Sequence, residues 1–440
     1  MSEVKISPEL HSEQASLLQS EYKLVKILKQ SGGTDQTIST GSVEVQFEVP
    51  GNRVINFAKS HLKFTSTFGA AGANLVLFEH RGTLPIRRIR LTTRQGAILM
   101  DLSHAREYVN AIARPETAFS KLRTNDQASG DLVAPFKPTL IGGAAGNDGK
   151  YASSGDLFTF QNSEPQVIKS AATAHTWSVN LAEAFPNSIL ALDKSIYFGE
   201  VLVMSITFGA RDEFGFEAAA ANDPTAGVVG LTNDVTLSNI GLYVAAEANH
   251  AVAQMKKNEV MAKGVMQPID YVHAYKSLQN GGTASVQLRF SGGHGQSLYR
   301  VYHTISSGVE SGNTLNSNIV QAAGANLGVG SIYTMINDMR QQEYDLAVAS
   351  NEDYDYLKSY FKGSALQSLS MYRQYWTWVE DLGNGVRNPS SKGLRVGLDL
   401  TRAEQKWSLY ANNQLGNRNH NSFACCQKTL VINNTGVQVV

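Results

Sequence analysis

The sequence predicts an all-β protein of two tandem eight-stranded jelly-roll barrels, with an N-terminal helix and a few short helices in the loops. Three observations lead to this prediction. Short segments in which apolar and polar residues alternate recur along the chain. Glycine-rich turns and long polar loops separate them, which is typical of β-sandwiches and barrels. The chain has 440 residues, enough for two domains of about 200 residues each.

Residues 8–30 carry the clearest helical pattern near the N-terminus. Ser7 can cap this helix, Pro8 suits its first turn, and apolar residues recur at helical spacing up to Gly32-Gly33. We therefore expect a helix here. Two interpretations stay open: the helix packs on its own domain, or it is an arm that reaches a neighbouring subunit.

The first half of the chain then becomes strand-like. Val43–Val49 alternates without interruption, and Glu200–Phe208 and Val235–Val244 are dense in apolar and β-branched residues. Residues 103–113 favour a short helix. Residues 123–165 are rich in Gly, Ala, Ser, Asn and Asp, and we expect a long exposed loop there.

The second half repeats this pattern. Alternation returns over residues 286–290 and 299–305, and residues 307–330 favour a second long loop. Glu352–Phe361 is predicted as a short helix. Leu369–Trp378 is predicted as an aromatic strand, on the strength of its aromatic content.

These elements divide the chain into four parts, because the strand pattern runs on both sides of a helical stretch at 248–264. The expected parts are an N-terminal helical arm (1–37), a first jelly roll (38–247), a helical linker (248–265) and a second jelly roll (266–440). Thr236–Val244 also resembles Thr429–Val439, and each segment lies where a domain should end, which gives weak support for duplication.

The charge of the chain bears on its partners. Only 17% of the residues are charged, against a usual share of about 25%, and the net charge is +0. A surface with few charges suits extensive contacts with neighbouring subunits, although a weakly charged monomer would also have it. The first 40 residues contain no basic arm, so direct binding of nucleic acid is not expected to be the main task.

Cysteine usage and hydropathy exclude other classes of protein. The only cysteines, Cys425 and Cys426, are adjacent and would point to opposite faces of a strand, so a bridge between them is not expected. The absence of a disulfide framework fits folding in a reducing cell interior. No apolar run reaches the roughly 18 residues of a membrane span, and the N-terminal residues show no secretory pattern.

Three motifs could carry chemistry, and each has a simpler structural interpretation. The glycine-rich segment Ser291–Ser297 lacks the following lysine and helix of a phosphate loop, so a turn is expected. His303 is in line with apolar neighbours and is predicted to be a hydrogen-bonded core or interface residue. The acidic cluster Glu352, Asp353 and Asp355 lacks the glycine and spaced oxygens of a calcium loop, and a solvated helix start explains it better.

The aromatic residues Tyr372, Tyr375, Trp376 and Trp378 could form a carbohydrate platform, but we favour barrel core and subunit contact. No nucleophile elbow and no zinc spacing is present. The sequence thus predicts no catalytic, cofactor-binding or metal-binding residues, no cofactor and no enzyme activity.

The order of elements resembles one protein family, the double jelly-roll major capsid proteins of polinton-like viruses, virophages, large eukaryotic DNA viruses and tailless phages. The resemblance rests on segments spread over most of the chain, none of them diagnostic alone: His175–Leu181, Phe185–Asn187, Leu190–Lys194, Glu200–Phe208, Val235–Val244 and Ser364–Leu400, the last with Tyr372, Trp376, Gly393 and Leu398–Leu400.

The resemblance implies a homotrimer whose six barrels form a pseudo-hexagonal capsomer, and an icosahedral shell tiled by such capsomers. It implies a place in the virion capsid, assembly inside the host cell, and minor capsid or penton proteins as partners. It leaves open whether an internal membrane is present. The alternative from another class is a jelly-roll carbohydrate- or receptor-binding protein, such as a spike or lectin, since the fold alone does not decide function.

Overall fold

The computed structural model describes residues 20–30, 35–68, 75–79, 85–113, 166–170, 174–214, 216–220, 223–307, 329–367, 369, 372, 376–383 and 397–440. The predicted loop at 123–165 lies outside these ranges, as do residues 308–328 of the second predicted loop. Residues 8–19 of the predicted N-terminal helix also lie outside them.

The first barrel consists of two antiparallel sheets. One sheet has the order β1-β14-β4-β10, with β2 on β14 and β9 on β4, and the other has the order β3-β11-β6-β7. The strands are β1 (Tyr22–Leu28), β2 (Gln36–Ile38), β3 (Val43–Val49), β4 (Val54–Phe68), β6 (Ile86–Thr93), β7 (Ile98–Ser103), β9 (Ala174–Asn180), β10 (Ile196–Tyr197), β11 (Leu202–Phe208) and β14 (Val235–Glu247).

The second barrel repeats this strand order. One sheet is β15-β24-β17-β21, with β22 on β17 and β25 on β24, and the other is β16-β23-β18-β19, with β20 on β18. The strands are β15 (Val265–Gln279), β16 (Gly282–Phe290), β17 (Ser297–Ser307), β18 (Ser331–Ile336), β19 (Met339–Arg340), β20 (Leu346–Ala347), β21 (Trp378–Asp381), β22 (Leu398–Asp399), β23 (Gln405–Gln414), β24 (Arg418–Asn433) and β25 (Gly436–Val439).

The main strands of each barrel, in chain order, number eight: β1, β3, β4, β6, β7, β9, β11 and β14 in the first, and β15, β16, β17, β18, β19, β21, β23 and β24 in the second. The first, eighth, third and sixth of these form one sheet, and the second, seventh, fourth and fifth form the other. This order is the double Greek key of a jelly roll. The predicted fold class, two tandem jelly rolls, is therefore confirmed. The two similar sequence segments match only in part, because Thr236–Val244 lies within β14, whereas Thr429–Val439 spans the turn between β24 and β25.

Alternation in the sequence explains the central strands. In β3, Val45, Phe47 and Val49 are buried, while the residues between them are half-buried. β11 pairs with β3 over its whole length and alternates in the same way. Such strands have one face on the core and one face outward, so period two in the sequence becomes inside and outside in the barrel.

Short helices connect the strands. They are α2 (Ala105–Tyr108), which continues into a π-helical turn at Val109–Ala113, α6 (Leu181–Ala184), α7 (His250–Lys263) and α8 (Glu352–Leu357), with 3₁₀ turns at Ile189–Ala191, Arg211–Glu213, Gly292–His294 and Ala365–Gln367. The Asn249 side chain caps α7 by accepting hydrogen bonds from the N–H groups of Ala251 and Val252. No helix among the described residues is long and apolar enough to cross a membrane.

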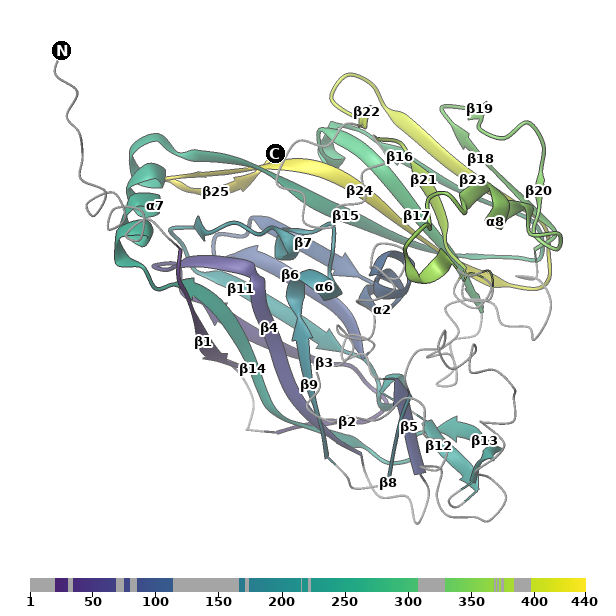
Figure 1. Cartoon of the computed structure of the whole chain (residues 1–440), viewed down its shortest axis with the longest axis horizontal. Helices are drawn as coiled ribbons and strands as arrows, with labels where there is room; N and C mark the ends of the chain where they lie inside the picture. Colours follow the sequence, from purple (N-terminus) through teal and green to yellow (C-terminus); the bar gives the residue numbers. More distant parts are fainter. Residues whose placement is uncertain are drawn as a thin grey trace.

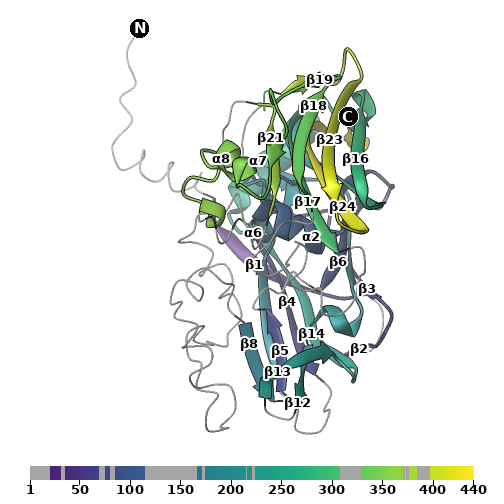
Figure 2. The ribbon, with the colours of Figure 1, turned by 90° about the vertical axis from the view of Figure 1, so that its right-hand side faces the viewer.

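A third, small sheet belongs to the loops of the first barrel. It has the order β13-β12-β5-β8, and its strands are β5 (Leu75–Glu79), β8 (Gln166–Ser170), β12 (Phe216–Ala220) and β13 (Asp223–Gly230). Figures 1 and 2 both place this sheet at the end of the first barrel that is farthest from the second barrel. The second barrel lies along one side of the first, with α7 at one end of the pair (Figure 1). Buried apolar side chains of both barrels form one continuous cluster.

The predicted helix at 8–30, and with it the helical arm at 1–37, is wrong where it can be compared. Residues 22–28 form β1, which pairs with β14 from Tyr22–Glu247 to Leu28–Gly241. The inward side chains Val25 and Ile27 are only half-buried, while Leu24 and Leu28 point outward. An edge strand that buries so little tolerates leucine on its outward face, and backbone pairing with β14 decides its structure.

The predicted strand at Leu369–Trp378 is also wrong at Leu369 and Tyr372, where the structure can be compared with it. Leu369 and Tyr372 have helical backbone, and β21 begins only at Trp378. The Tyr372 hydroxyl and the Trp376 indole N–H both donate to Asp353 Oδ2. These two bonds hold the segment against α8 instead of in the sheet.

Candidate functional site

The glycine-rich segment Ser291–Ser297 is a tight turn between β16 and β17. The N–H of Ser291 donates to His294 Nδ1 at 3.1 Å, and the His294 carbonyl oxygen lies 2.9 Å from His273 Nε2. Gly295 has φ 139°, and a Cβ there would lie 2.6 Å from the Gln427 carbonyl oxygen. A strand follows the turn, so the segment lacks the helix N-terminus that cradles a phosphate.

The acidic cluster does not converge on one point. Glu352 accepts from the N–H of Ala347, and the exposed Asp355 pairs with Lys358. Asp353 is buried and accepts the two aromatic hydrogen bonds described above. Among the described residues, no three His, Cys, Asp or Glu side chains lie close enough together to hold a metal ion.

The aromatic residues that the structure describes are core, as we favoured, and the subunit contact stays a prediction. Tyr372, Trp376 and Trp378 are all buried, and Tyr375 lies outside the described residues. The carbohydrate platform that the alternative function would need is therefore not formed by these three side chains.

His303 is a hydrogen-bonded core residue, as predicted. Its Nδ1 lies 2.7 Å from Ser422 Oγ, and its Nε2 lies 3.0 Å from His420 Nδ1. His420 Nε2 lies 2.7 Å from the side-chain oxygen Oε1 of Gln414. The side-chain nitrogen of Gln414 donates to the backbone carbonyl oxygens of Gln279, Asn280 and Gly416. Because an amide oxygen only accepts, His420 carries its proton on Nε2, and a neutral His303 then donates from its own Nε2.

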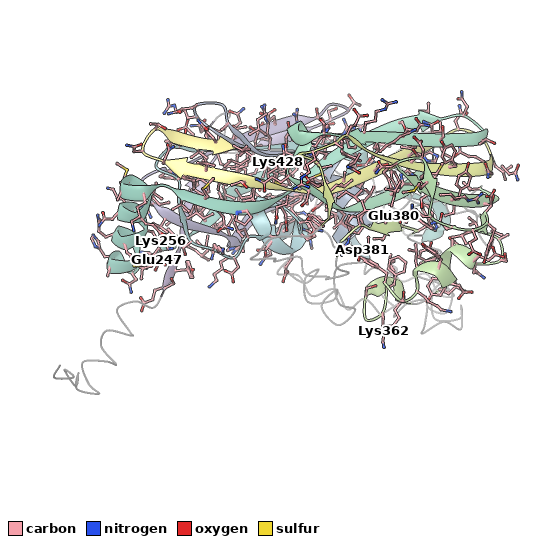
Figure 3. All side chains as sticks on the ribbon, turned by 90° about the horizontal axis from the view of Figure 1, so that it is seen from above. Glu247, Lys256, Lys362, Glu380, Asp381 and Lys428 are labelled. Carbon is pink, nitrogen blue, oxygen red and sulfur yellow. The ribbon has the colours of Figure 1, made fainter. Side chains whose placement is uncertain are left out.

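Burial lowers the pKa of both rings. Burial lowers the pKa of His420 to about 4. The pKa of His303 lies well below its usual value, mainly because the ring is buried and also because a charge on His420 would repel a second one. Burial has the opposite effect on an acid, and it raises the pKa of Glu380 in the core of the same barrel. The next residue, Asp381, forms an ion pair with Arg300. Figure 3 labels Glu380 and Asp381 on the second barrel. His303, His420 and Glu380 are buried and hydrogen-bonded to neighbouring side chains of the same barrel.

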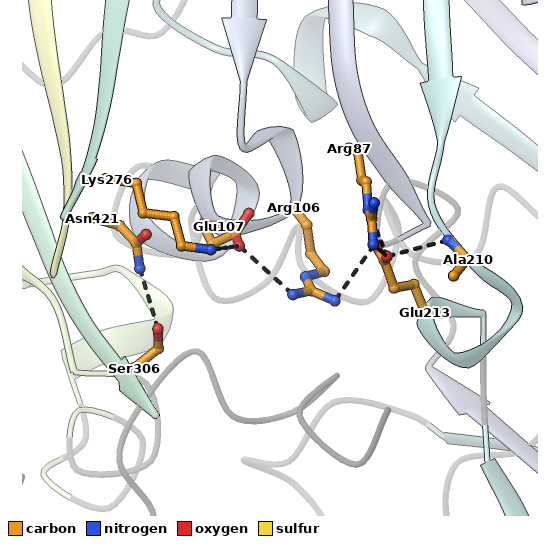
Figure 4. A network of polar contacts seen from close by, with 8 residues as sticks. All are labelled: Arg87, Arg106, Glu107, Ala210, Glu213, Lys276, Ser306 and Asn421. Carbon is orange, nitrogen blue, oxygen red and sulfur yellow. Dashed lines mark hydrogen bonds and ion pairs between the residues drawn. The ribbon is translucent and has the colours of Figure 1, made fainter. Parts of the chain in front are cut away.

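Charged side chains of both barrels form a network of polar contacts at the junction between the barrels (Figure 4). Lys276 Nζ of β15 lies 3.7 Å from Glu107 Oε1 of α2, which lies 3.6 Å from Arg106 Nη2. Arg106 Nη1 lies 3.7 Å from Glu213 Oε2, and Arg87 Nε donates to Glu213 Oε1 at 2.6 Å. Positive and negative side chains thus alternate from the second barrel into the first.

Electrostatics at the junction favour the charged form of Glu107. Burial alone would raise the pKa of this carboxyl, but Arg106, Lys276 and His104 together hold it below its usual value. The cations outweigh the desolvation. Arg106 has the larger effect of the two nearest cations, and Lys276 comes from the other barrel, so docking of the two barrels adds to the stabilisation of the ionised Glu107.

Apolar and backbone contacts extend this junction. The rings of Tyr108 and Phe423 meet edge to face at 5.6 Å, one from each barrel. At the other end of the contact, Lys194 Nζ donates to Gln267 Oε1 at 2.9 Å, and the N–H of Val437 donates to Glu200 Oε1 at 3.0 Å. The two barrels are therefore joined along their length as one body.

Sequence reasoning identified none of these junction residues. Glu107 and Lys276 lie far apart in the chain, and each reads as an ordinary charged residue of a helix or strand. Only the sparing use of charge pointed to large contacts, and it named no position. Chemically, the junction binds one barrel to the other through ion pairs and an aromatic contact.

The fold of the chain is that of known viral capsid proteins. The Faustovirus major capsid protein superposes with a TM-score of 0.56 at 9% identity, covering 94% of this chain and 91% of that one. PBCV-1 VP54, fitted into a reconstruction of the virophage Sputnik, gives 0.54 at 10% identity, covering 96% and 97%. The Sputnik virophage structure gives 0.52 at 11% identity, covering 100% and 93%. No protein-family model and no curated protein matches the sequence.

Proposed function

We propose that this chain is a viral major capsid protein that assembles as homotrimers, whose six barrels form pseudo-hexagonal capsomers of an icosahedral shell. The observation that carries the proposal is the likeness of fold to the Faustovirus major capsid protein over 94% of this chain and 91% of that one. A match over nearly the whole of both chains includes the tandem arrangement of the barrels.

The junction supports a structural role. Ion pairs, the Tyr108–Phe423 contact and the hydrogen bonds at Lys194 and Glu200 join the barrels into one body. A shell subunit has to transmit load between neighbours, and a rigid pair of barrels meets that need. We accordingly propose a protein without enzyme activity, located in the virion, with itself as main partner and with minor capsid or penton proteins as further partners.

We keep the proposed division at 38–247, 248–265 and 266–440, with β1 added to the first jelly roll. It is supported by strand pairing, because each paired strand among the described residues has its partners on its own side of α7. The carbohydrate-binding alternative has lost its main support, since Tyr372, Trp376 and Trp378 are buried.

Sedimentation velocity and electron microscopy of the purified protein test the proposal. We expect a trimer of three 47.7 kDa chains and, at high concentration, larger regular particles. Trimers should persist at high salt, because contacts made by apolar burial are screened little, whereas weak binding to nucleic acid should disappear. A monomer at both low and high salt would contradict a capsid role.

A further inference from the structure

The two barrels differ in the exposure of one equivalent surface, the outer face of the sheet that holds the first and eighth strands. In the second barrel this face is covered by the first barrel, and Phe423 and Cys425 on it are fully buried. In the first barrel the same face is uncovered, and Leu24 and Leu28 are 48% and 65% exposed. We name this uncovered surface the open face. It comprises Leu24, Lys26 and Leu28 of β1, Tyr243 of β14, and His61 and Lys63 of β4.

The open face has the composition of an interface centre. The Tyr243 ring stacks on the His61 ring at 5.0 Å and an angle of 3°. Lys63 Nζ lies 5.1 Å and Lys26 Nζ 5.9 Å from the centre of the Tyr243 ring. Neither ammonium group has a carboxylate partner among the described residues. Apolar and aromatic side chains beside unpaired cations fit a protein partner that brings carboxylates.

The contact inside the chain indicates which partner this is. On the second barrel, the equivalent sheet face meets α2, the helix that follows the fifth strand of the first barrel. There a sheet lysine, Lys276, pairs with a helix carboxylate, Glu107, beside the Tyr108–Phe423 contact. This contact joins a sheet face of one barrel to a helix of the other. Each chain therefore retains one sheet face, on the first barrel, and one helix, on the second barrel, that make no such contact within the chain.

The unused helix of the second barrel is α8, which follows β20 as α2 follows β7. It exposes Asp355, whose only ion pair in the described residues is with the exposed Lys358. It also exposes Tyr356, whose ring is stacked on Trp378 at 5.6 Å. α8 thus offers an aromatic ring and a carboxylate, the same two kinds of group that α2 offers.

We propose that the open face binds the α8 side of the second barrel in another copy of this chain. The proposal rests on the proposed function and specifies the surfaces that build its trimer. A contact between two different surfaces leads from copy to copy in one direction, and it closes into a ring when the rotation permits. Three chains then place their six barrels in a ring. The contact between two chains is of the same kind as the contact between the two barrels inside one chain.

Substitution of Leu28 tests the open face, with a matched control elsewhere on the surface. Leu28→Asp places a charge at the proposed contact, whereas Leu415→Asp changes an equally exposed leucine, 69% exposed, in the turn between β23 and β24. By sedimentation equilibrium we expect Leu28→Asp to raise the concentration needed for trimers about 30-fold or more. Leu415→Asp should leave it unchanged. Circular dichroism checks that both variants are folded.

Charge reversal tests the partner surface. Lys26→Glu with Lys63→Glu should weaken trimers, and adding Asp355→Lys in the same chain should restore them in part. If Leu28→Asp and the double lysine variant both form trimers like the parent protein, the open face is not the contact and the inference is overturned, while the proposed function stands. If both weaken trimers and Asp355→Lys restores nothing, the assignment to α8 is overturned. A monomeric parent protein would instead contradict the proposed function itself.

Discussion

His303 Nε2 lies 3.0 Å from His420 Nδ1 in the core of the second barrel, and both rings are buried. The chain of hydrogen bonds from Ser422 through both rings to Gln414 is complete when both histidines are neutral. An added proton must enter an apolar core that also contains Trp376 and Trp407, whose rings lie 6.4 Å and 5.9 Å from that of His303. The pair therefore makes the second barrel sensitive to acid.

Acid should destabilise the second barrel through this pair. The pKa of His420 in the folded chain is about 4, below its usual value of 6.5, so the unfolded chain binds a proton more readily. Stability is then retained above pH 6.5 and is lost as pH falls from 6.5 towards 4, by a few kcal/mol in order of magnitude. Denaturant unfolding at pH 7.5, 6 and 4.5 measures this loss. His420→Gln should make the free energy of unfolding depend less on pH. The control, His250→Gln at an exposed position on α7, should leave that dependence unchanged. If the free energy of unfolding fell equally with pH in the parent protein and both variants, this explanation would be contradicted.

Glu380 should act in the opposite direction at higher pH. Burial raises the pKa of its carboxyl above 4.5 in the folded chain, so its contribution is fully present below pH 4.5 and is lost as pH rises through the folded pKa. Glu380→Gln removes this ionisation and keeps an oxygen that can accept from Trp378. We expect the variant to gain stability relative to the parent protein at pH 8 more than at pH 4.5. Glu48→Gln on β3 is the control, and the same gain there would contradict the prediction.

The part of this fold that depends on local alternation of apolar and polar residues could be predicted from the sequence. β3 and β11 have one buried face, so their sequences alternate and indicate their structure directly. β1 has no fully buried side chain, so its sequence has no such constraint, and its leucines happen to match helical spacing. Its strand structure comes from pairing with β14, which follows it by more than 200 residues.

The contacts that matter for function depend on topology more strongly still. Tyr372 and Trp376 looked like a strand because they are aromatic, but Asp353 binds both from a preceding helix. Glu107 and Lys276 become partners only once two barrels are docked. Polar pairing across distant segments leaves no periodic signal in a single sequence, so neither contact could be predicted from it.

Backbone geometry should make Gly295 irreplaceable. Its φ of 139° strains any residue with a side chain, and a Cβ would lie 2.6 Å from the Gln427 carbonyl oxygen, a backbone atom that has little freedom to move. We expect Gly295→Ala to lower the free energy of unfolding by about 2 kcal/mol or more. Gly293→Ala in the same turn is the matched control, because a Cβ there has no heavy atom within 4 Å. Thermal unfolding compares the two, and equal midpoints would contradict the prediction.

The buried cysteines should be inert in the folded protein. Cys425 and Cys426 are fully buried, and burial raises the pKa of the Cys426 thiol to about 12. Since the thiolate is the reactive form, neither should react with a thiol reagent at pH 8 until the barrel opens. Titration with such a reagent in buffer and in denaturant measures this. Rapid reaction of either cysteine in buffer would show that β24 is more accessible than its burial implies.

The Glu107–Lys276 pair should contribute more to stability than an ordinary surface ion pair. Glu107→Ala leaves Arg106 and Lys276 without their shared carboxylate in a mostly buried place, and we expect a loss of about 3 kcal/mol in the free energy of unfolding. Lys276→Met keeps the apolar stem of the side chain and should cost less, because Arg106 still neutralises Glu107. The double variant should lose less than the sum of the two single losses, since residues in contact do not act additively.

Denaturant unfolding of the parent protein, the two single variants and the double variant at pH 7 gives the coupling energy between Glu107 and Lys276. The exposed pair Arg289–Glu404, 3.4 Å apart, is the control and should show a coupling below about 1 kcal/mol. Strict additivity at Glu107 and Lys276 would mean that the two side chains do not cooperate in holding the barrels together, and that the apolar contact of Tyr108 with Phe423 carries the junction instead.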